Sequence, residues 1–212
     1  MTIDFKQDIL APVATDFAAM DKFINEGITS KVALVMAVSK HVVEAGGKRM
    51  RPALLLLAAG AVGFNGKEKH ELAAVVEFIH TATLLHDDVV DESDLRRGRE
   101  TANAAFGNAA SVLVGDFLYT RAFQMMVAVD NMRVMQILAN ATNIIAEGEV
   151  LQLMNAHDPD TTEERYLEVI YRKTAKLFEA GAQVAAIVAN AGPAVEQAMI
   201  AYGRHLGARR VH

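Results

Sequence analysis

Cysteine is absent from the 212-residue sequence, which excludes disulfide bonds, thiolate metal sites and a cysteine nucleophile. Only four prolines interrupt the chain, and alternating polar and apolar residues bounded by hairpin signals are lacking, so the sequence favours helices over strands. The most apolar stretch, from Ala53 to Phe64, is too short to cross a bilayer. The lack of cysteine fits a cytoplasmic protein, and we expect one without stable membrane insertion.

The composition is that of a folded chain with a mildly acidic balance. Hydrophobic residues make up 52% of the sequence, and the formal net charge is −5 at pH 7. This apolar content is too high, and the charge too low, for a disordered chain. The length suits one domain with a substantial core, so we expect a single domain over residues 1–212. Nucleic-acid binding needs a concentrated basic surface, and no nucleic-acid partner is expected.

Long stretches rich in Ala, Leu, Met, Glu and Gln, all good helix formers, fill the sequence. Thr161 and Glu164 fit a capping box, with Thr161 as the N-cap and Glu164 reaching back to its amide. Neither an internal repeat nor a linker divides the chain, so the expected fold class is all-α, a helical bundle. The predicted helices cover residues 5–24, 29–44, 52–62, 69–91, 108–128, 132–155, 162–190 and 194–206.

Three aspartates, Asp87, Asp88 and Asp91, end the predicted helix over residues 69–91. Residues four apart share a helical face, so Asp87 and Asp91 point the same way. Their repulsion and the negative end of the helix dipole cost stability unless a cation binds there. Oxygen ligands without cysteine point to a hard ion, and Mg²⁺ with retained waters and substrate phosphate fits best. The alternative is a solvated acidic helix end, although the mostly apolar helix before it favours a metal site.

Basic residues cluster on both sides of this helix. Residues 46–52 read Gly-Gly-Lys-Arg-Met-Arg-Pro, a loop whose glycines permit close approach of a ligand and whose cations precede a helix N-terminus. Such a loop suits a diphosphate. Residues 96–99, Arg-Arg-Gly-Arg, follow the aspartates closely, so a polyphosphate could be held between metal and guanidinium. Lys173 and Lys176 form a third candidate. For residues 46–52 and for Lys173 and Lys176, the alternative is ordinary charged surface. For residues 96–99, the alternative is that the basic loop balances the charge of the acidic helix end.

These motifs together resemble those of the trans-prenyltransferases, or polyprenyl diphosphate synthases, and most closely those of bacterial octaprenyl diphosphate synthases. The resemblance covers the chain to about Gly207 and implies an isoprenoid synthase-like bundle of long helices around a central cavity, usually a homodimer. It implies condensation of isopentenyl diphosphate with an allylic prenyl diphosphate to give a medium-to-long product, a precursor of quinone side chains. It rests on residues 46–52, His80, residues 87–91 and residues 96–98, with support from residues 107–116, 147–153 and 171–175.

The resemblance also assigns roles to single residues. The implied holders of isopentenyl diphosphate are Lys48, Arg51, His80 and Arg97. The implied holders of the allylic diphosphate are Arg96, Lys173 and Thr174, with Mg²⁺ on Asp87, Asp88 and Asp91. Those expected to act in catalysis are Asp87, Asp91, Arg96 and Lys173. Taken alone, a histidine such as His80 on an apolar helix is more often a packed core residue.

The residues one to two turns before Asp87 point down the cavity, and here they are Ala82 and Thr83. Family members that make short products commonly carry an aromatic residue at the position of Ala82, which blocks the tunnel. A small residue leaves the tunnel open, so we predict a medium-to-long product; ordinary helix packing by alanine is the alternative. Candidate floor residues on the next helix are Phe123, Met125 and Met126.

The end of the sequence departs from the family pattern. Family members carry a Phe-Gln pair and a second Asp-rich motif shortly after the position of Gly207, whereas no aspartate follows Asp160 here and the sequence ends Arg-Arg-Val-His. We expect the C-terminal part of the family fold to be missing. Because lost metal stabilisation slows the reaction by orders of magnitude, we expect this chain alone to bind diphosphates weakly and turn over little or nothing.

Two other functions fit parts of the sequence. The chain could be a non-catalytic partner that contributes a helical surface to a complete synthase. A di-iron carboxylate bundle fits Glu77 and His80, which have Glu-x-x-His spacing, but such a site needs a second pair on a facing helix. The sequence does not supply that second pair.

Overall fold

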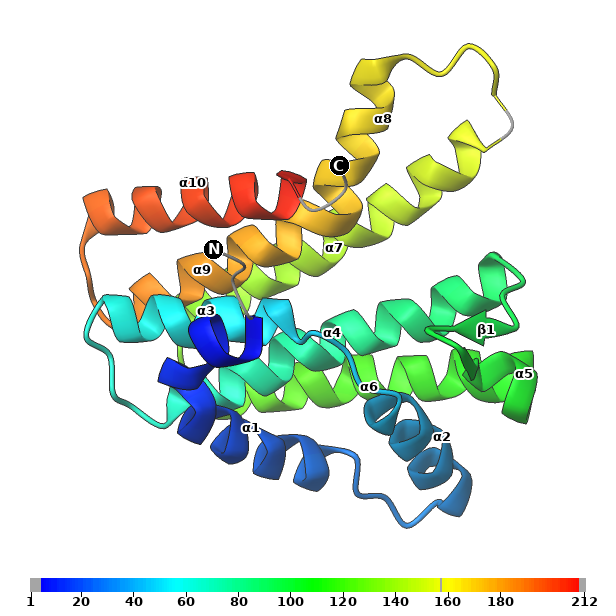
Figure 1. The fold of residues 1–212 in the computed structure, drawn as a ribbon, viewed down its shortest axis with the longest axis horizontal. Coiled ribbons are helices and arrows are strands. Elements are labelled where there is room, and N and C mark those ends of the chain that lie inside the picture. Colours follow the sequence, from blue (N-terminus) through cyan, green and yellow to red (C-terminus); the bar gives the residue numbers. More distant parts are fainter. Residues whose placement is uncertain (1–4, 157, 210–212) are drawn as a thin grey trace. The chain divides into compact units, whose positions relative to one another are not determined.

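The computed structural model of the chain describes residues 5–156 and 158–209, so residues 210–212 of the Arg-Arg-Val-His tail lie outside it. The described part is mostly helical, which confirms the expected all-α class (Figure 1). None of its helices is long and apolar enough to span a membrane. The elements are η1 (Phe5–Leu10), η2 (Ala11–Val13), α1 (Ala14–Gly27), α2 (Ala33–Glu44), α3 (Met50–Ala61), α4 (Glu68–Val90), β1 (Leu95–Arg96), β2 (Arg99–Glu100), α5 (Ala102–Phe106), α6 (Asn108–Ala128), α7 (Met132–Asn155), α8 (Glu163–Ile170), η3 (Tyr171–Ala175), α9 (Lys176–Val188) and α10 (Pro193–Arg209).

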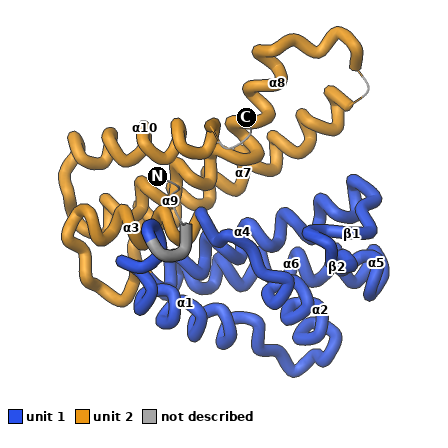
Figure 2. Tube along the Cα trace, in the orientation of Figure 1, with its two compact units in different colours: residues 1–50, 70–129 blue, residues 51–69, 130–212 orange. Residues whose placement is uncertain are grey.

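The chain divides into two compact units (Figure 2). Unit 1 comprises residues 1–50 and 70–129, and unit 2 comprises residues 51–69 and 130–212. The boundaries at residues 50 and 69 fall inside α3 and α4, so each of these helices contributes residues to both units. The single domain expected from the sequence stays a prediction.

The core of unit 1 is built on α4. Every side chain from Leu72 to Ile79 except that of Glu77 is buried, as expected for a helix that is apolar around most of its circumference. α1 approaches α4 through Gly27, where an added Cβ would lie 2.7 Å from Cζ of Phe78. Helices α2 and α5 contact each other and α6. This packing carries the polar C-terminal end of α4, with its aspartates, out of an apolar core.

Unit 2 is built on α9, in which residues 176–182 are buried without a break. α10 packs closely on α9 and on the end of η3, because two of its residues are glycines. A Cβ at Gly203 would lie 2.6 Å from the carbonyl oxygen of Phe178, and one at Gly207 would lie 2.5 Å from Cα of Ala175. A larger side chain at either glycine would therefore force the helices apart.

The helix expected over residues 162–190 is built in three parts, because the π-helix η3 separates α8 from α9. The capping box predicted for Thr161 and Glu164 is wrong by one residue: the N-cap is Thr162, whose side chain accepts a hydrogen bond from the amide of Arg165 at 3.3 Å. The reason is the preceding turn, in which the amide of Thr161 donates to the carbonyl oxygen of Asp158 at 3.2 Å. The helix therefore starts one residue later.

The segment over residues 92–107, which lies between two predicted helices, contains the β1–β2 hairpin and α5. Arg96 pairs with Arg99 in antiparallel register, and the two turn residues between them, Arg97 and Gly98, have φ angles of 55° and 76°. Two central residues with positive φ are typical of a type I′ hairpin turn. Because Asn-Gly and Asp-Gly are the usual signals for that turn, the Arg-Gly pair did not predict it.

Glu196 of α10 joins three helices of unit 2. It accepts hydrogen bonds from Arg133 of α7 and from Gln183 of α9, both at 2.9 Å. The hydrogen bond from Gln183, followed by that from Arg133, lowers the pKa of Glu196 below its ordinary value, while burial opposes the shift. Since the folded state lowers this pKa, the carboxylate stabilises the fold above its unfolded pKa and loses that contribution as the pH falls.

We predict that Glu196→Gln lowers the free energy of unfolding by about 1 kcal/mol near pH 7. The difference from the unsubstituted chain should shrink towards zero between about pH 5 and pH 3, where the carboxyl group of Glu196 becomes neutral like the glutamine amide. Urea unfolding followed by circular dichroism across this pH range measures the difference. An equal difference at both ends of the range would contradict the prediction.

Candidate active site

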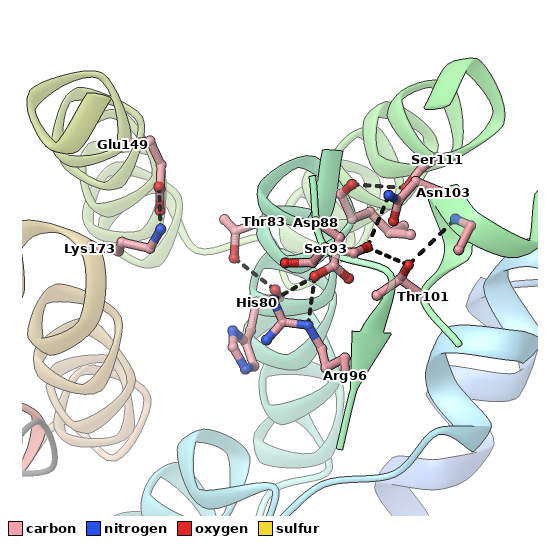
Figure 3. Close-up of polar contacts among 12 residues, drawn as sticks. His80, Thr83, Asp88, Ser93, Arg96, Thr101, Asn103, Ser111, Glu149 and Lys173 are labelled. Carbon is pink, nitrogen blue, oxygen red and sulfur yellow. Dashed lines mark hydrogen bonds and ion pairs between the residues drawn. The ribbon is translucent and has the colours of Figure 1, made fainter. Parts of the chain in front are cut away.

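The aspartates at the end of α4 adopt two different arrangements. The amide of Asp91 donates to the carbonyl oxygen of Asp87 at 2.7 Å, so helical geometry continues to Asp91 and keeps the two residues one turn apart. Asp88 is buried, at 5% exposure. Its Oδ1 accepts from Nε and Nη2 of Arg96, at 2.9 and 2.6 Å (Figure 3). Asp88 thus anchors an arginine, while Asp87 and Asp91 share the face predicted for the metal.

The hairpin after α4 returns Arg96 to Asp88 and is closed at its base. The side chain of Thr101 donates to the carbonyl oxygen of Ser93 at 2.7 Å, and Nδ2 of Asn103 donates to the same oxygen at 3.1 Å (Figure 3). These contacts fix both ends of the hairpin. Its arginines are therefore held close to the aspartates and are not on a loose loop.

The same hairpin contacts the glycine-rich basic loop of unit 1. Nη1 of Arg97 donates to the carbonyl oxygen of Gly46, and Arg99 donates to that of Glu44 at 2.7 Å. A Cβ at Gly47 would lie 3.2 Å from Cζ of Arg97, so the glycine leaves room for the guanidinium group. The exposed Lys48 follows directly. The structure therefore brings together the two basic segments, as the diphosphate hypothesis requires.

Not every cation of the loop belongs to this cluster. Arg49, which has a φ angle of 45°, forms an ion pair with Asp21 of α1. Between α1 and the loop lies a cavity of about 380 Å³, lined by residues that include Ile24, Val43 and Gly47. Arg49 thus ties the loop to α1.

His80 and the residues predicted to set product length lie along α4. His80 is half-buried, and its carbonyl oxygen accepts from the hydroxyl of Thr83 at 2.8 Å (Figure 3). Ala82 is fully buried. On α6, Met125 and Met126 are buried and Phe123 is half-buried. The proposed diphosphate contact of His80 and the chain-length roles stay predictions.

A stacked row of rings, unnoticed in the sequence, runs from α4 along α6. The ring of His86 lies parallel to that of Tyr119, with centroids 6.4 Å apart, and Tyr119 lies beside Phe123 at 6.5 Å. Gly115 makes room for His86, since a Cβ there would lie 2.7 Å from Cδ2 of the imidazole. Two aromatic residues four apart on a predicted helix are the sequence signal for this row.

In unit 2, Arg51 is buried in the first turn of α3. Its guanidinium carbon lies 4.8 Å from the centroid of the Phe178 ring, a cation–π geometry. This contact orients the arginine that the resemblance assigns to isopentenyl diphosphate.

Lys173 and Thr174 lie on the π-helix η3. Nζ of Lys173 donates to Oε2 of Glu149 at 2.6 Å (Figure 3), and the neighbouring Arg172 donates to Glu147 at 2.6 Å. Gly148 lies between the two glutamates, and a Cβ there would lie 2.7 Å from Cβ of Arg172. η3 thus packs directly on α7 with an ion pair on either side of the glycine.

A cavity of about 610 Å³ opens beside this cation. Lys173 and Thr174 line it, together with residues of α7, of α8 and of the connecting segment, including Gln152, Asn155 and Tyr166. Two of the three residues predicted to hold the allylic diphosphate therefore border a space large enough for a small ligand.

The predicted site residues thus fall into two groups. Unit 1 contains Lys48, His80, Asp87, Asp88, Asp91, Arg96 and Arg97, and unit 2 contains Arg51, Lys173 and Thr174. Within unit 1 the aspartates, the hairpin and the glycine-rich loop are joined by direct contacts. That the two groups form one site stays a prediction.

The side chains in the described part of the chain indicate how a metal would be held. They contain no group of three or more His, Asp or Glu side chains arranged to bind one, so the di-iron alternative finds no support in them. Asp88 is paired with Arg96, and Asp87 and Asp91 lie one turn apart on one face of α4. One or two carboxylates plus waters and substrate phosphate are the usual set for Mg²⁺. The residues therefore fit a metal that binds together with a diphosphate.

Known proteins are similar to this chain in sequence. Residues 32–209 match the polyprenyl synthetase family. The chain is 61% identical over 208 residues to an all-trans-nonaprenyl-diphosphate synthase (geranyl-diphosphate specific) from Rhodobacter capsulatus, covering 98% of this chain and 64% of the relative. It is 58% identical over 194 residues to octaprenyl diphosphate synthase from Escherichia coli (strain K12), covering 92% and 60%. It spans about three fifths of the length of these relatives.

Solved structures of polyprenyl synthases are also similar to this chain. A decaprenyl diphosphate synthase from Rhodobacter capsulatus has a TM-score of 0.91 at 53% identity, covering 94% of this chain and 62% of that one. A polyprenyl synthase from Caulobacter crescentus CB15, complexed with calcium and isoprenyl diphosphate, has a TM-score of 0.92 at 47% identity, covering 94% and 61%. These likenesses confirm the isoprenoid synthase-like fold class. With a family match over most of its length, the chain belongs to the polyprenyl synthetase family.

Proposed function

We propose that this chain acts as a trans-prenyltransferase, joining isopentenyl diphosphate to an allylic prenyl diphosphate to make a medium-to-long, octaprenyl-like polyprenyl diphosphate. One observation in unit 1 carries the proposal. On a single short hairpin, Arg96 pairs with Asp88 beside the other two aspartates, and Arg97 reaches the glycine-rich loop. Acidic groups suited to a metal and basic groups suited to a diphosphate are therefore held together.

The basic residues divide between the two substrates. Isopentenyl diphosphate is bound by four residues, namely Lys48, Arg51, His80 and Arg97. The allylic diphosphate is held by Arg96, Lys173 and Thr174. Guanidinium groups supply forked contacts to phosphate oxygens, and Lys173 transfers from Glu149 to the more highly charged diphosphate.

The family requires a divalent metal, and we propose Mg²⁺ held by Asp87 and Asp91, with Asp88 as a further candidate ligand. When bound, the metal neutralises charge on the leaving diphosphate and is worth several kcal/mol of stabilisation. Arg96 and Lys173 add fixed positive charge at the same group. As the C–O bond breaks, the allylic carbon becomes cationic and the double bond of isopentenyl diphosphate attacks it. The released diphosphate accepts the proton that is then lost, so the protein supplies no base.

A residue of α4, Ala82, sets the length of the product. Ala82 is fully buried and lies less than two turns before Asp87, and its small side chain leaves room for a growing prenyl chain. The relatives above carry names of nonaprenyl and octaprenyl synthases, which supports a product of similar length.

We propose that the protein works in the cytoplasm as a homodimer. Exposed apolar side chains support a partner surface, since large ones left in water favour association. In unit 1 they include Val112, Leu113 and Val127 on α6, and in unit 2 Met132, Val150, Leu153 and Met154 on α7.

Product analysis tests the proposal. The 212-residue chain is compared with a longer form that continues it with the C-terminal part of an octaprenyl diphosphate synthase. Each is incubated with labelled isopentenyl diphosphate, a farnesyl-type primer and Mg²⁺, and products are sized by mass spectrometry. We expect polyprenyl diphosphates from the longer form and little or no product from the chain alone. If the longer form makes none but the chain binds a full-length synthase as a stable heterodimer, it is a non-catalytic partner.

A second prediction concerns the metal ligands. Asp87→Asn and Asp91→Asn should each weaken Mg²⁺-dependent binding of inorganic diphosphate to the chain at least tenfold, a loss of about 1.4 kcal/mol, because each removes one carboxylate donor. Isothermal titration calorimetry with and without Mg²⁺ measures this. Asp94→Asn, an exposed residue of the same segment, is the matched control and should bind as the unsubstituted chain does. Equal binding by all variants would remove the aspartates from the site.

Ala82→Phe in the longer, active form should shorten the product, because the aromatic ring fills the space below Asp87. We expect a product several isoprene units shorter with primer consumption retained. Val90→Ala, at an exposed position of the same helix, is the control and should leave the product length unaltered. An unchanged product from Ala82→Phe would show that the chain grows elsewhere.

A further inference from the structure

The π-helix η3 carries Lys173 and Thr174, the two residues of unit 2 to which the proposed function assigns the allylic diphosphate. π-helices are rare and occur mostly as single turns near functional sites. A local geometry of this kind persists only when the surrounding structure holds it. The contacts around η3 therefore determine how it presents these two residues.

The best-defined of these contacts is a buried polar cluster formed by Tyr171, Lys176 and Glu179. Glu179 is 6% exposed and Lys176 is 9% exposed. Both oxygens of the Glu179 carboxylate are used: Oε1 accepts from Nζ of Lys176 at 2.5 Å, and Oε2 accepts from the hydroxyl of Tyr171 at 3.0 Å. A buried carboxylate is costly unless its oxygens are satisfied in this way. The cluster thus fixes the first residue of η3 to α9.

This cluster depends on the π-turn. In an unbroken α-helix, residues eight apart are offset by about 80° around the axis, which would separate Tyr171 from Glu179. The wider π-turn takes up an additional residue and returns the two side chains to one face. The Tyr171–Glu179 hydrogen bond is therefore available to the π register and is lost from the α register.

Neighbouring helices hold η3 from two sides. On one side, Gly148 of α7 contacts Arg172 and the amide of Lys173. On the other, Gly207 of α10 packs on Ala175, and the guanidinium carbon of Arg204 lies 4.6 Å from the centroid of the Tyr171 ring. Lys173 meets Glu149 of α7, whereas Tyr171 is held by α9 and α10.

The hydroxyl of Tyr171 keeps its proton at ordinary pH. Burial, and next the negative charge of Glu179, raise the pKa of Tyr171 above its usual value. The phenol therefore remains a donor to the carboxylate.

We propose that Tyr171 and Glu179 are positioning residues that hold η3 in its π register and so direct Lys173 and Thr174 towards the allylic diphosphate. The proposal rests on the proposed function for the identity of the ligand. Its structural part, that Tyr171 sets the position of Lys173, stands apart from any substrate. The two parts call for separate measurements.

The test variant is Tyr171→Phe, which removes the hydroxyl and keeps the ring beneath Arg204. Tyr202→Phe is the matched control, because Tyr202 is an exposed tyrosine of α10 in the same unit. The first measurement is the rate at which acetic anhydride labels Nζ of Lys173 in the 212-residue chain, read by mass spectrometry relative to the lysines of unit 1. The second is the KM for a farnesyl-type primer and for isopentenyl diphosphate in the longer form.

We expect Tyr171→Phe to change the labelling rate of Lys173 and to raise the KM for the allylic primer, each about two- to tenfold, the range that loss of one hydrogen bond produces. The KM for isopentenyl diphosphate should stay within twofold, as should every value for Tyr202→Phe. A merely structural role would lower the unfolding midpoint and leave the two KM values in their original ratio.

The outcomes separate the two proposals. Unchanged Lys173 labelling and an unchanged KM ratio in an active Tyr171→Phe enzyme would overturn the positioning role. Altered labelling with no prenyl transfer by the unsubstituted longer form would support the positioning role and overturn the proposed function. Gly148→Ala, which disturbs η3 from the side of α7, gives an independent check and should shift Lys173 labelling as well.

Discussion

The buried ion pair of Asp88 and Arg96 is the interaction on which the polar end of unit 1 depends. A carboxylate at 5% exposure needs a partner, and Arg96 supplies two donors to one oxygen. To reach it, the chain must reverse directly after α4, where Glu92 has a φ angle of 51° and the amide of Ser93 donates to the carbonyl oxygen of Asp88 at 2.9 Å. That reversal places Arg97 against the glycine-rich loop. One charge pair thus organises three segments.

The helical period explains which parts of this arrangement the sequence could predict. Asp87 and Asp91 share a face because they are four residues apart, and the structure keeps them one turn apart. Periodicity also places Asp88 on a different side of the helix from Asp87 and Asp91. It does not predict that Asp88 is buried, since a polar residue next to an exposed one carries no burial signal. The pairing with Arg96 needed the hairpin, and an Arg-Gly turn lacks the usual signal for one.

In unit 2, too, the sequence predicted a helix but did not predict its local geometry. Good helix formers over residues 162–190 predicted one helix, and most of that segment is helical. The π-turn at its centre arises from packing against Gly148 and Gly207 and from the Tyr171–Glu179 bond, all of which involve partners distant along the chain or in the next turns. Local propensity does not contain such information. The cations nearby are pre-paired with Glu147 and Glu149, which lowers the cost of holding them together before an anion arrives.

The π-turn has a consequence for how this segment can change during evolution. Its five residues occupy a span that a regular helix would fill with one fewer, so a single-codon deletion there would restore uniform α geometry. Because the π-turn takes up its additional residue and keeps the flanking side chains on one face, α8 and α9 would face nearly as before after that deletion. The change would fall on the π-turn itself, where Lys173 and Thr174 lie. One further inserted residue in a regular helix would instead rotate everything on one side by about 100° relative to the other, so this segment tolerates the loss of a residue better than the gain of one.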